Sequence, residues 1–319
     1  MKEIIVSKEA EGQRIDKFIR KFLNEAPLSF IYKLFRKKDI KVNGKHSDIN
    51  YIIKCNDVIR IYINDQQLLD FNAPRPIVNQ RFDHEIIYED ENILIVNKPR
   101  GLLVHGDESE KRVTLTNQVL NYLYSKGEYD PHLSTGFIPG PAHRIDRNTS
   151  GLVVFGKNLP ALQSLFELFK DHNNVSKSYL ALVVGNIPYG GTIDIPLEKN
   201  ENDGYVKANK NGKKAITHYE VEEMFSDFTL LKVRILTGRT HQIRVHMKAI
   251  NHPIVGDSKY GDFAVNKVFS KQFNYENQFL HSYQLVFINP IGVLAYLKGK
   301  SFTCSLGKKE ADILRRLRH

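Results

Sequence analysis

A short polar turn places one carboxylate between two arginines. It reads His143-Arg144-Ile145-Asp146-Arg147-Asn148-Thr149-Ser150-Gly151 and runs into the apolar stretch Leu152-Val153-Val154-Phe155. The apolar stretch predicts a buried strand, so Asp146 is expected at a strand edge. Arg144 and Arg147 should keep this carboxylate ionised and available to a ligand. Such a setting suits a nucleophile or a base, although an arbitrary Arg-x-Asp is more often a structural ion pair.

A tyrosine lies in a second apolar run. The segment is Lys177-Ser178-Tyr179-Leu180-Ala181-Leu182-Val183. Its composition predicts a strand. Taken alone, Tyr179 is more often a core tyrosine with a satisfied hydroxyl than a catalytic group.

A third segment combines arginines and histidines at the start of a predicted helix. It reads Gly238-Arg239-Thr240-His241-Gln242-Ile243-Arg244-Val245-His246-Met247, with Thr240 the expected N-cap. Arg244 and Lys248 fall on one helix face, which could bind phosphate, pair with a carboxylate or simply face solvent. The histidines at 241, 246 and 252 are spaced by five and six, which does not place them on one face. We therefore predict no metal site.

Together these segments resemble the active-site motifs of the RluA-type pseudouridine synthases. The matching strings are His143–Gly151, the Lys177-Ser178-Tyr179-Leu180-Ala181 string, the Gly238–His246 string, Asn97-Lys98-Pro99 with Gly101, and His252-Pro253-Ile254-Val255-Gly256-Asp257 with Tyr260-Gly261. They follow the family order, and the chain is most similar to the subgroup that modifies several positions of large-subunit ribosomal RNA.

The resemblance implies roles for these residues. Asp146 would be the essential carboxylate, Tyr179 would stack on the base, and Arg244 would pair with Asp146. Arg144 would fill the space that a flipped nucleotide leaves or hold its phosphate. His143, Arg239 and His241 would also bind the substrate, and no cofactor is implied.

The composition points to a polyanionic partner. The chain has 319 residues and a net charge of +10. That excess favours nucleic acid or an anionic membrane surface. No stretch approaches the ~18 apolar residues of a spanning helix, and the N-terminus does not read as a signal peptide. Cys55 and Cys304 are expected to be reduced thiols of a cytoplasmic protein.

Residues 1–64 predict a separate basic module. They carry 14 Lys and Arg against 8 Asp and Glu, a net charge of +6. Apolar residues from Ile15 to Leu23 repeat with helical spacing, and a second helix is expected from Leu28 to Arg36. An Asn43-Gly44 hairpin follows. The pattern resembles the S4 RNA-binding domain, which implies RNA contacts by Arg36, Lys37, Lys38, Lys41 and Lys45, whereas the composition alone also allows an unliganded cationic surface.

The remainder divides into a linker and one large domain. Residues 65–80 read as a linker because amides, acids and two prolines crowd together. Residues 81–319 are expected to form the catalytic domain. Mixed helices and alternating strands predict an α+β fold with a mixed, largely antiparallel sheet. Asn158 is expected to cap a helix whose apolar side carries Leu162, Leu165, Phe166 and Phe169.

The predicted activity is isomerisation of specific uridines to pseudouridine in RNA, with large-subunit ribosomal RNA as the expected substrate, by a monomer without cofactor or metal. A non-enzymatic RNA-binding or ribosome-assembly factor explains the charge and residues 1–64 equally well. That alternative does not need Asp146, Tyr179 and Arg244 together. A metal-dependent RNA hydrolase would need clustered carboxylates, which neither Glu222-Glu223 nor Glu89-Asp90-Glu91 suggests.

Overall fold

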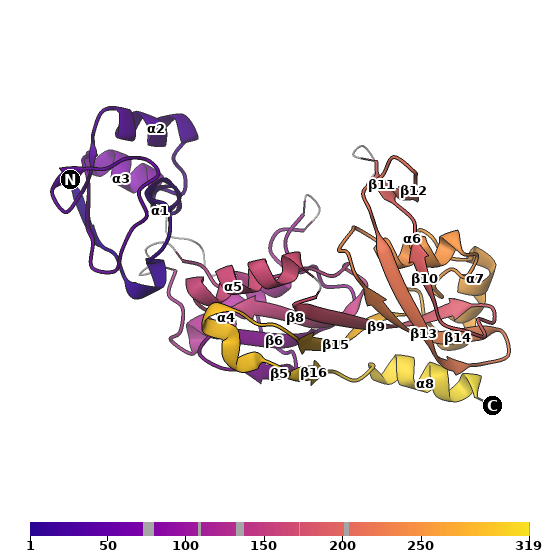
Figure 1. Ribbon diagram of the computed structural model, residues 1–319. Coiled ribbons are helices and arrows are strands. Elements are labelled where there is room, and N and C mark those ends of the chain that lie inside the picture. The colour runs from indigo at the N-terminus through magenta and orange to yellow at the C-terminus, as the bar shows by residue number, and fades with distance from the viewer. Residues whose placement is uncertain (73–79, 108–109, 132–136, 172, 201–203, 319) are drawn as a thin grey trace.

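A computed structural model describes residues 1–72, 80–107, 110–131, 137–171, 173–200 and 204–318. The N-terminal part forms a separate body at one end of the molecule (Figure 1). Its elements are β1 (Lys2–Ile5), η1 (Lys8–Ala10), α1 (Ile15–Phe22), α2 (Leu28–Arg36), β2 (Ile40–Val42), β3 (Lys45–His46), β4 (Val58–Ile61) and α3 (Asp65–Phe71). The strands pair antiparallel in the order β1-β4-β2-β3.

The local patterns of this module give the predicted elements. Helix α1 buries Ile15, Phe18 and Ile19, which share one helical face. Helix α2 has the predicted bounds. The β2–β3 turn places Asn43 at φ 51° and Gly44 at φ 80°. Positive φ at both central residues is the geometry of a type I′ hairpin, for which Asn-Gly is the preferred pair.

The prediction of a linker over residues 65–80 is wrong for its first half. Residues 65–71 form helix α3, and Leu68 and Phe71 pack on the N-terminal core. The Asn64 side chain accepts a hydrogen bond from Gln67 N at 2.7 Å, and Gln67 Oε1 accepts one from Asn64 N at 3.3 Å. The amides that suggested a linker are therefore a capping box. Residues 73–79 lie outside the described residues.

The larger part of the chain is built on a ten-stranded sheet, as far as the described residues show. Its main path is β10-β13-β14-β9-β15-β8-β6-β5, with β16 beside β15 and β7 beside β8. Only the β15–β8 pair is parallel among the pairs of this sheet. The predicted α+β fold with a largely antiparallel sheet is confirmed. The strands of this part are β5 (Ile86–Glu89), β6 (Ile93–Lys98), β7 (Gly140–Pro141), β8 (Ser150–Gly156), β9 (Val175–Val184), β10 (Gly191–Asp194), β11 (Leu197–Lys199), β12 (Val206–Ala208), β13 (Ile216–Met224), β14 (Phe228–Ile235), β15 (Leu280–Phe287) and β16 (Ser301–Thr303).

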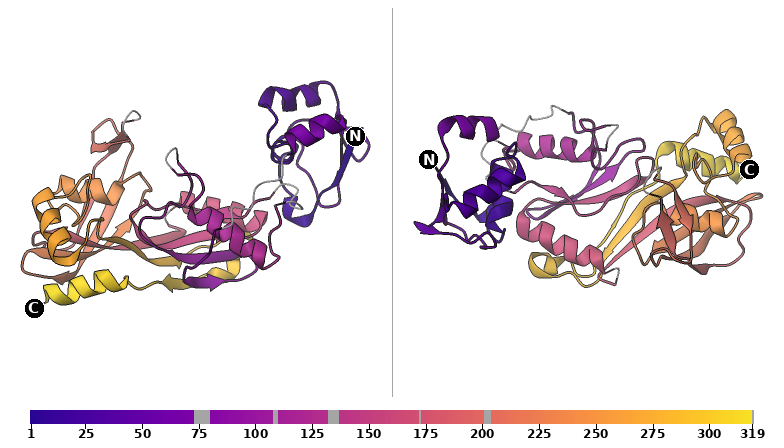
Figure 2. Two further views of the ribbon diagram at one scale, coloured as in Figure 1. Left: turned by 180° about the vertical axis from the view of Figure 1, so that it is seen from behind. Right: turned by 90° about the horizontal axis from the view of Figure 1, so that it is seen from above.

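Helices cover both faces of the sheet around β6 and β8. The helices are α4 (Leu115–Ser125), α5 (Leu159–Lys170), α6 (Gln242–Ala249), α7 (Phe263–Phe273), η2 (Gly292–Leu297) and α8 (Lys308–Leu317). Leu94 and Val96 of β6 belong to the same cluster as Leu115 of α4, whereas Ile93 and Ile95 pack with Leu165 of α5. Because successive strand residues point to opposite faces, burial on both faces requires the continuous apolar runs seen in the sequence. Figure 2 shows these layers from behind and from above.

Two helix predictions need correction. In α5, Asn158 caps as expected by accepting from Ala161 N at 2.9 Å, but Phe166 is 46% exposed and Leu168 is buried instead. Leu162, Leu165 and Phe169 pack on this core as predicted, so Phe166 is the one predicted residue that faces away from it. Helix α6 is capped by His241 at φ 53° and not by Thr240.

The catalytic-motif turn joins β7 to β8 at the parallel β8–β15 contact. Gly151 has φ 111°, and a Cβ atom there would lie 2.1 Å from the Ser282 backbone oxygen. Only glycine satisfies both demands. Gly151 therefore lets β8 start tightly against β15 and fixes the base of the loop that carries Asp146.

Candidate active site

A cleft of about 530 Å³ opens beside Asp146. It is lined by residues 142–146 and Thr149 of the β7–β8 loop, by Phe169 and Lys170 of α5, by Lys177 and Tyr179 of β9, by Ile235, by residues 236–241, by Gln242, Ile243 and Arg244 of α6, and by Leu280. The Asp146 side chain is 27% exposed, so its carboxylate can reach a ligand in this cleft. The fold thus brings together Asp146 and Arg244, which are 98 residues apart in sequence.

Arg244 is buried between two carboxylates. Its Nη1 donates to Asp146 Oδ2 at 3.0 Å, and its Nε and Nη2 donate to Asp257 Oδ2 and Oδ1 at 2.7 and 2.9 Å. Burial disfavours the charged guanidinium, but the hydrogen bonds and charges of Asp257 and Asp146 outweigh it and raise the pKa of Arg244. Arg244 therefore stays a cation that is held by one acid and presented to the other.

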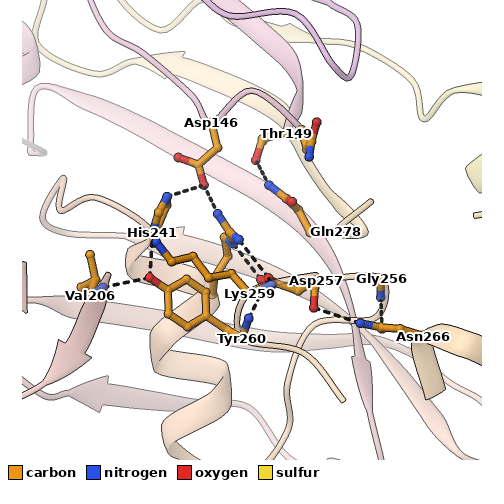
Figure 3. A network of polar contacts seen from close by, with 12 residues as sticks. Asp146, Thr149, Val206, His241, Gly256, Asp257, Lys259, Tyr260, Asn266 and Gln278 are labelled. Atoms are coloured by element: carbon orange, nitrogen blue, oxygen red, sulfur yellow. Dashed lines mark hydrogen bonds and ion pairs between the residues drawn. The ribbon is translucent and has the colours of Figure 1, made fainter. Parts of the chain in front are cut away.

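Asp257 is the fixed anchor of this arrangement. Its side chain is fully buried and Oδ1 also accepts from the backbone N–H groups of Lys259 and Tyr260, each at 2.9 Å. Burial would raise the pKa of Asp257, but the hydrogen bond and charge of Arg244 outweigh it and keep that pKa below its usual range. Asn266 donates to the Asp257 backbone oxygen at 2.9 Å, so the anchor is tied into α7 (Figure 3).

His241 lies between the Asp146 carboxylate and the Tyr260 hydroxyl (Figure 3). Its Nε2 lies 4.0 Å from Asp146 Oδ2, and its Nδ1 lies 2.9 Å from the Tyr260 hydroxyl. That hydroxyl accepts from Val206 N at 2.9 Å, and its own proton has no other acceptor within the described part of the chain. Tyr260 therefore donates to Nδ1, which puts the imidazole proton on Nε2, facing Asp146. Burial lowers the pKa of His241 although Asp146 opposes the shift, which favours the neutral imidazole over the cation.

Strand β9 contributes Tyr179 and Lys177 to the floor of the cleft. Both residues are buried and two positions apart, so they point to the same face. Burial raises the pKa of Tyr179, with Asp146 acting in the same direction and a hydrogen bond to Ser282 opposing it. The phenol is therefore neutral, and Tyr179 lines the same cleft as Asp146.

A buried lysine, whose pKa burial lowers to about 7, and a half-buried arginine hold the loop from behind. Lys98 Nζ donates to the backbone oxygens of Pro99, Leu102 and Arg147 at 2.8, 2.8 and 3.0 Å. Arg100 Nη1 donates to Asn148 O at 3.0 Å, while its Nε contacts Glu310 of α8 at 2.5 Å. The two carbonyls that follow Asp146 are thus tied to the 98–100 turn, which restrains the direction in which the carboxylate points.

The arginines next to Asp146 do not do what the sequence predicted. Arg144 is exposed at the cleft, and Arg147 lies 3.7 Å from Asp107. The cation that contacts Asp146 is Arg244, from a distant helix. Arg144 remains placed to meet a ligand, because its side chain lines the cleft.

Arg239 and His143, which were also predicted to bind the substrate, both line the cleft but differ in exposure. Arg239 lines the cleft, is exposed, and donates to Lys214 O at 2.9 Å. His143 lines the cleft with a ring that packs on Phe169 at 4.7 Å between centroids, but its Nε2 accepts from Val154 N at 3.3 Å. Burial, with help from Lys177, lowers the pKa of His143 well below its ordinary value. His143 is thus neutral and is partly engaged by β8.

His246 and His252, the other two histidines considered as metal ligands, have separate hydrogen-bond partners. His246 contacts Thr217 Oγ1 and Ile195 O, both at 2.9 Å, and His252 Nδ1 contacts Val184 O at 2.8 Å. Within the described residues, no group of three or more His, Cys, Asp or Glu could hold a metal ion.

The basic residues predicted for the N-terminal module gather around one turn. Arg36, Lys37 and Lys38 end α2 and are exposed, and Lys45 is exposed on the β2–β3 hairpin. Lys41 is half-buried, with its Nζ 4.9 Å above the Tyr62 ring. These five residues form a patch at the α2–β2–β3 corner, within which Lys41 partly packs on an aromatic ring.

Sequence reasoning missed the functional placement of Asp257, Tyr260 and Lys98. All three lie in strings that had been identified: Asp257 and Tyr260 in the 252–261 string, and Lys98 in the 97–101 string. The first string was read as structural support and the second as a turn that shapes the pocket. The signal in the sequence was an acid and a tyrosine three residues apart, Asp257 and Tyr260, each next to a glycine.

The chain belongs to the RNA pseudouridylate synthase family, whose sequence pattern matches residues 92–249. It is an RNA pseudouridine synthase, an isomerase of uridine in RNA. It is 34% identical to ribosomal large subunit pseudouridine synthase C of Vibrio cholerae over 293 residues, which covers 90% of this chain and 89% of that protein. It is also 34% identical to the uncharacterised RNA pseudouridine synthase YlyB of Bacillus subtilis, covering 90% of each chain.

Solved structures agree with this assignment. The structure of human RNA pseudouridylate synthase domain containing 4 has a TM-score of 0.57 and 26% identity, covering 73% of this chain and 92% of that one. Among the helices within the described ranges, none has the length and apolar character needed to cross a membrane.

Proposed function

We propose that this synthase modifies specific uridines of large-subunit ribosomal RNA, with Asp146 as the catalytic carboxylate. The observation that supports the catalytic role is the convergence of Asp146, Arg244 and Tyr179 on one cleft. The substrate is inferred from relatives such as the Vibrio cholerae protein, whose name specifies the large ribosomal subunit.

The reaction breaks the N1–C1′ bond of uridine and forms a C5–C1′ bond. The proton leaves C5 and N1 ends protonated, so nothing is gained or lost. Asp146 either attacks C1′ or removes the C2′ proton, and both steps require the carboxylate to be ionised. Arg244 serves either route, because a guanidinium held by Asp257 at 2.7 and 2.9 Å keeps a positive charge beside Asp146 before and after reaction.

The detached uracil must stay in place while it turns. A uridine in folded RNA is first flipped out of its stack, which costs a few kcal/mol. Tyr179 lies on the cleft floor near Asp146 and offers its ring as a surface for the base. Arg144, which is exposed and lines the cleft, would occupy the vacated space or hold the nucleotide's phosphate, and Arg239, which is also exposed there, would bind the RNA backbone.

We further infer that the N-terminal module is an S4-like RNA-binding domain, that residues 81–319 form the catalytic domain, and that the enzyme works as a cytoplasmic monomer. The basic corner formed by Arg36, Lys37, Lys38, Lys41 and Lys45 supports RNA binding, since four of these cations are exposed and free to meet phosphates. Because α3 packs on its core, the module extends through residue 71.

The catalytic assignment is tested with Asp146→Asn. This change keeps the size of the side chain and should abolish pseudouridine formation while RNA affinity stays within a few-fold of wild type. The product is detected on large-subunit ribosomal RNA, without added metal, as reverse-transcription stops at carbodiimide adducts that resist alkali. Asp227→Asn, at the exposed turn between β13 and β14 and outside the cleft, is the matched control and should stay active. Full activity of Asp146→Asn would end the catalytic proposal.

The substrate and the module are tested separately. A strain that lacks this gene should lose pseudouridine at defined positions of large-subunit ribosomal RNA, and a plasmid copy should restore them; loss only in transfer RNA would refute the substrate. Replacing Arg36, Lys37 and Lys38 by Gln should weaken RNA binding and reduce its salt dependence. An unchanged slope of log Kd against log salt would remove this corner from the interface.

A further inference from the structure

The cleft contains a buried cation for which the catalytic steps above have no use. Lys177 is 7% exposed, yet it lines the cleft on the floor that also carries Tyr179. Other buried cations of the site have defined acceptors: Arg244 has two carboxylates and Lys98 has three carbonyls. Lys177 has neither an ion pair nor a hydrogen bond in the described part of the chain, and its ammonium lies 5.1 Å from the centre of the Phe169 ring.

This arrangement is costly without a ligand. A buried ammonium loses its hydration, and a cation–π contact replaces only part of it. Burial accordingly lowers the pKa of Lys177 to about 8. A methionine or leucine would fill the same space without this cost, so the ammonium needs a reason that the free protein does not supply.

The charges around the cleft indicate what that reason is. The lining residues include five cations, Arg144, Lys170, Lys177, Arg239 and Arg244, and among the described lining residues Asp146 is the only acid. Asp146 already contacts Arg244. An incoming anion would therefore meet Lys177 without competition from a carboxylate.

We propose that Lys177 binds a backbone phosphate of the RNA next to the uridine that is held at Asp146. This inference rests on the proposed role of Asp146 as the reaction centre. Lys177 and Tyr179 are two residues apart on β9, which separates their Cα atoms by about 7 Å. A neighbouring nucleotide can span that distance, so a base over Tyr179 brings an adjacent phosphate to the ammonium. An ammonium acts on phosphate as a point charge and needs no fixed fork geometry.

The surroundings explain why one phosphate would be selected. The wall next to Lys177 includes Phe169 and the neutral His143 ring, which pack in a tilted arrangement with 4.7 Å between their centroids and leave Lys177 largely buried. In such a setting a charge pair is worth more than at an exposed surface. Arg144 and Lys170, which line the same cleft, are exposed and would add weaker, screened attraction.

The test compares Lys177→Met with Lys177→Arg, both combined with Asp146→Asn so that bound RNA is not converted. The probe is a large-subunit ribosomal RNA transcript. Lys177→Met should bind at least about tenfold more weakly at low salt. Its slope of log Kd against log salt should be less negative by about 0.7, the value for one phosphate on a single strand. Lys177→Arg should retain both the affinity and the salt slope. The matched control is Lys271→Met, at an exposed lysine of α7 that does not line the cleft.

A second arm identifies the phosphate. The probe is a short RNA that contains a uridine that the wild-type enzyme converts. Each phosphate next to this uridine is replaced in turn by a neutral methylphosphonate. One replacement should weaken binding with Lys177 present and have no further effect in Lys177→Met. The proposal is overturned if no single replacement weakens binding, if Lys177→Met keeps the parent salt slope, or if Lys177→Arg loses as much affinity as Lys177→Met.

Stability and activity separate this proposal from simpler explanations. Lys177→Met should unfold at a urea concentration no lower than that of wild type, since it removes an uncompensated charge. A lower midpoint together with unchanged affinity would make Lys177 a structural residue. Absence of pseudouridine with the wild-type enzyme would instead refute the proposed function, which the binding arms do not measure.

Discussion

The carboxylate of Asp257 should be needed for catalysis although it does not line the cleft. It receives four hydrogen bonds: two from Arg244, at 2.7 and 2.9 Å, and two from the backbone of Lys259 and Tyr260, at 2.9 Å. Asp257→Asn keeps the shape but exchanges one acceptor oxygen for an NH₂ group. One Arg244 bond is then lost, and a buried guanidinium faces a donor instead of an anion.

Two effects of this change can be estimated. Breaking a buried ion pair by removing one partner costs about 3 kcal/mol or more. For a domain the size of residues 81–319, this lowers the melting temperature by roughly 6 to 12 °C. The loss of one anchor also lets Arg244 tilt, and a displacement of about 1 Å at a reacting group costs on the order of 100-fold in rate. The loss should appear in kcat, with KM little changed, because Asp257 does not line the cleft.

The assay is pseudouridine formation at a temperature at which the variant is fully folded by circular dichroism. Asp262→Ala serves as the stability control, because Asp262 caps α7 by accepting from Ala264 N at 2.9 Å and does not contact Arg244. It should lose about 1 kcal/mol and keep its kcat. If Asp257→Asn is destabilised and yet turns over at the wild-type rate, then Arg244 does not depend on Asp257 for its orientation and the reasoning is refuted.

Three further predictions concern the supports of the site and the N-terminal module. Tyr260→Phe removes the hydroxyl that accepts from Val206 N and contacts His241 Nδ1. The Val206 N–H then lacks an acceptor, which should destabilise the enzyme by about 1 to 3 kcal/mol. The His241 ring should also take both tautomers, which ¹⁵N NMR of the imidazole would report. Lys177→Met should change the pH dependence of stability: burial lowers the pKa of Lys177 to about 8, so between pH 8 and 10 the unfolded chain binds a proton that the folded chain does not. Wild-type stability should therefore rise relative to the variant over that window, by about 3 kcal/mol at most, and urea unfolding at pH 7 and pH 10 that shows equal differences would contradict it. Asn64→Ala should cost about 1 kcal/mol by removing the α3 cap, seen as a lower urea midpoint of the N-terminal module, whereas the exposed Gln66→Ala should change little.

The elements that could be predicted are those whose pattern is local. Helix α1 and the Asn43-Gly44 hairpin depend on side-chain period and turn chemistry, both of which are readable over a few residues. Helix α3 was missed because its capping box has the same amides and acids as a linker. In α5, the stripes through Phe166 and through Leu168 are neighbours, and only packing against β8 and η2 decides which one is buried.

The sequence by itself determined the chemistry-bearing strings, the order in which they occur and the strands and helices on which they lie. The residues near Asp146 favoured its neighbours Arg144 and Arg147 as the cations beside it, and only the family resemblance implied Arg244. Tertiary structure decided this: α6 delivers Arg244 across 98 residues, and Asp257 fixes its direction. The physical reason is that charge pairing depends on distance and burial, and both are set by how the sheet and its helices pack, not by separation along the chain.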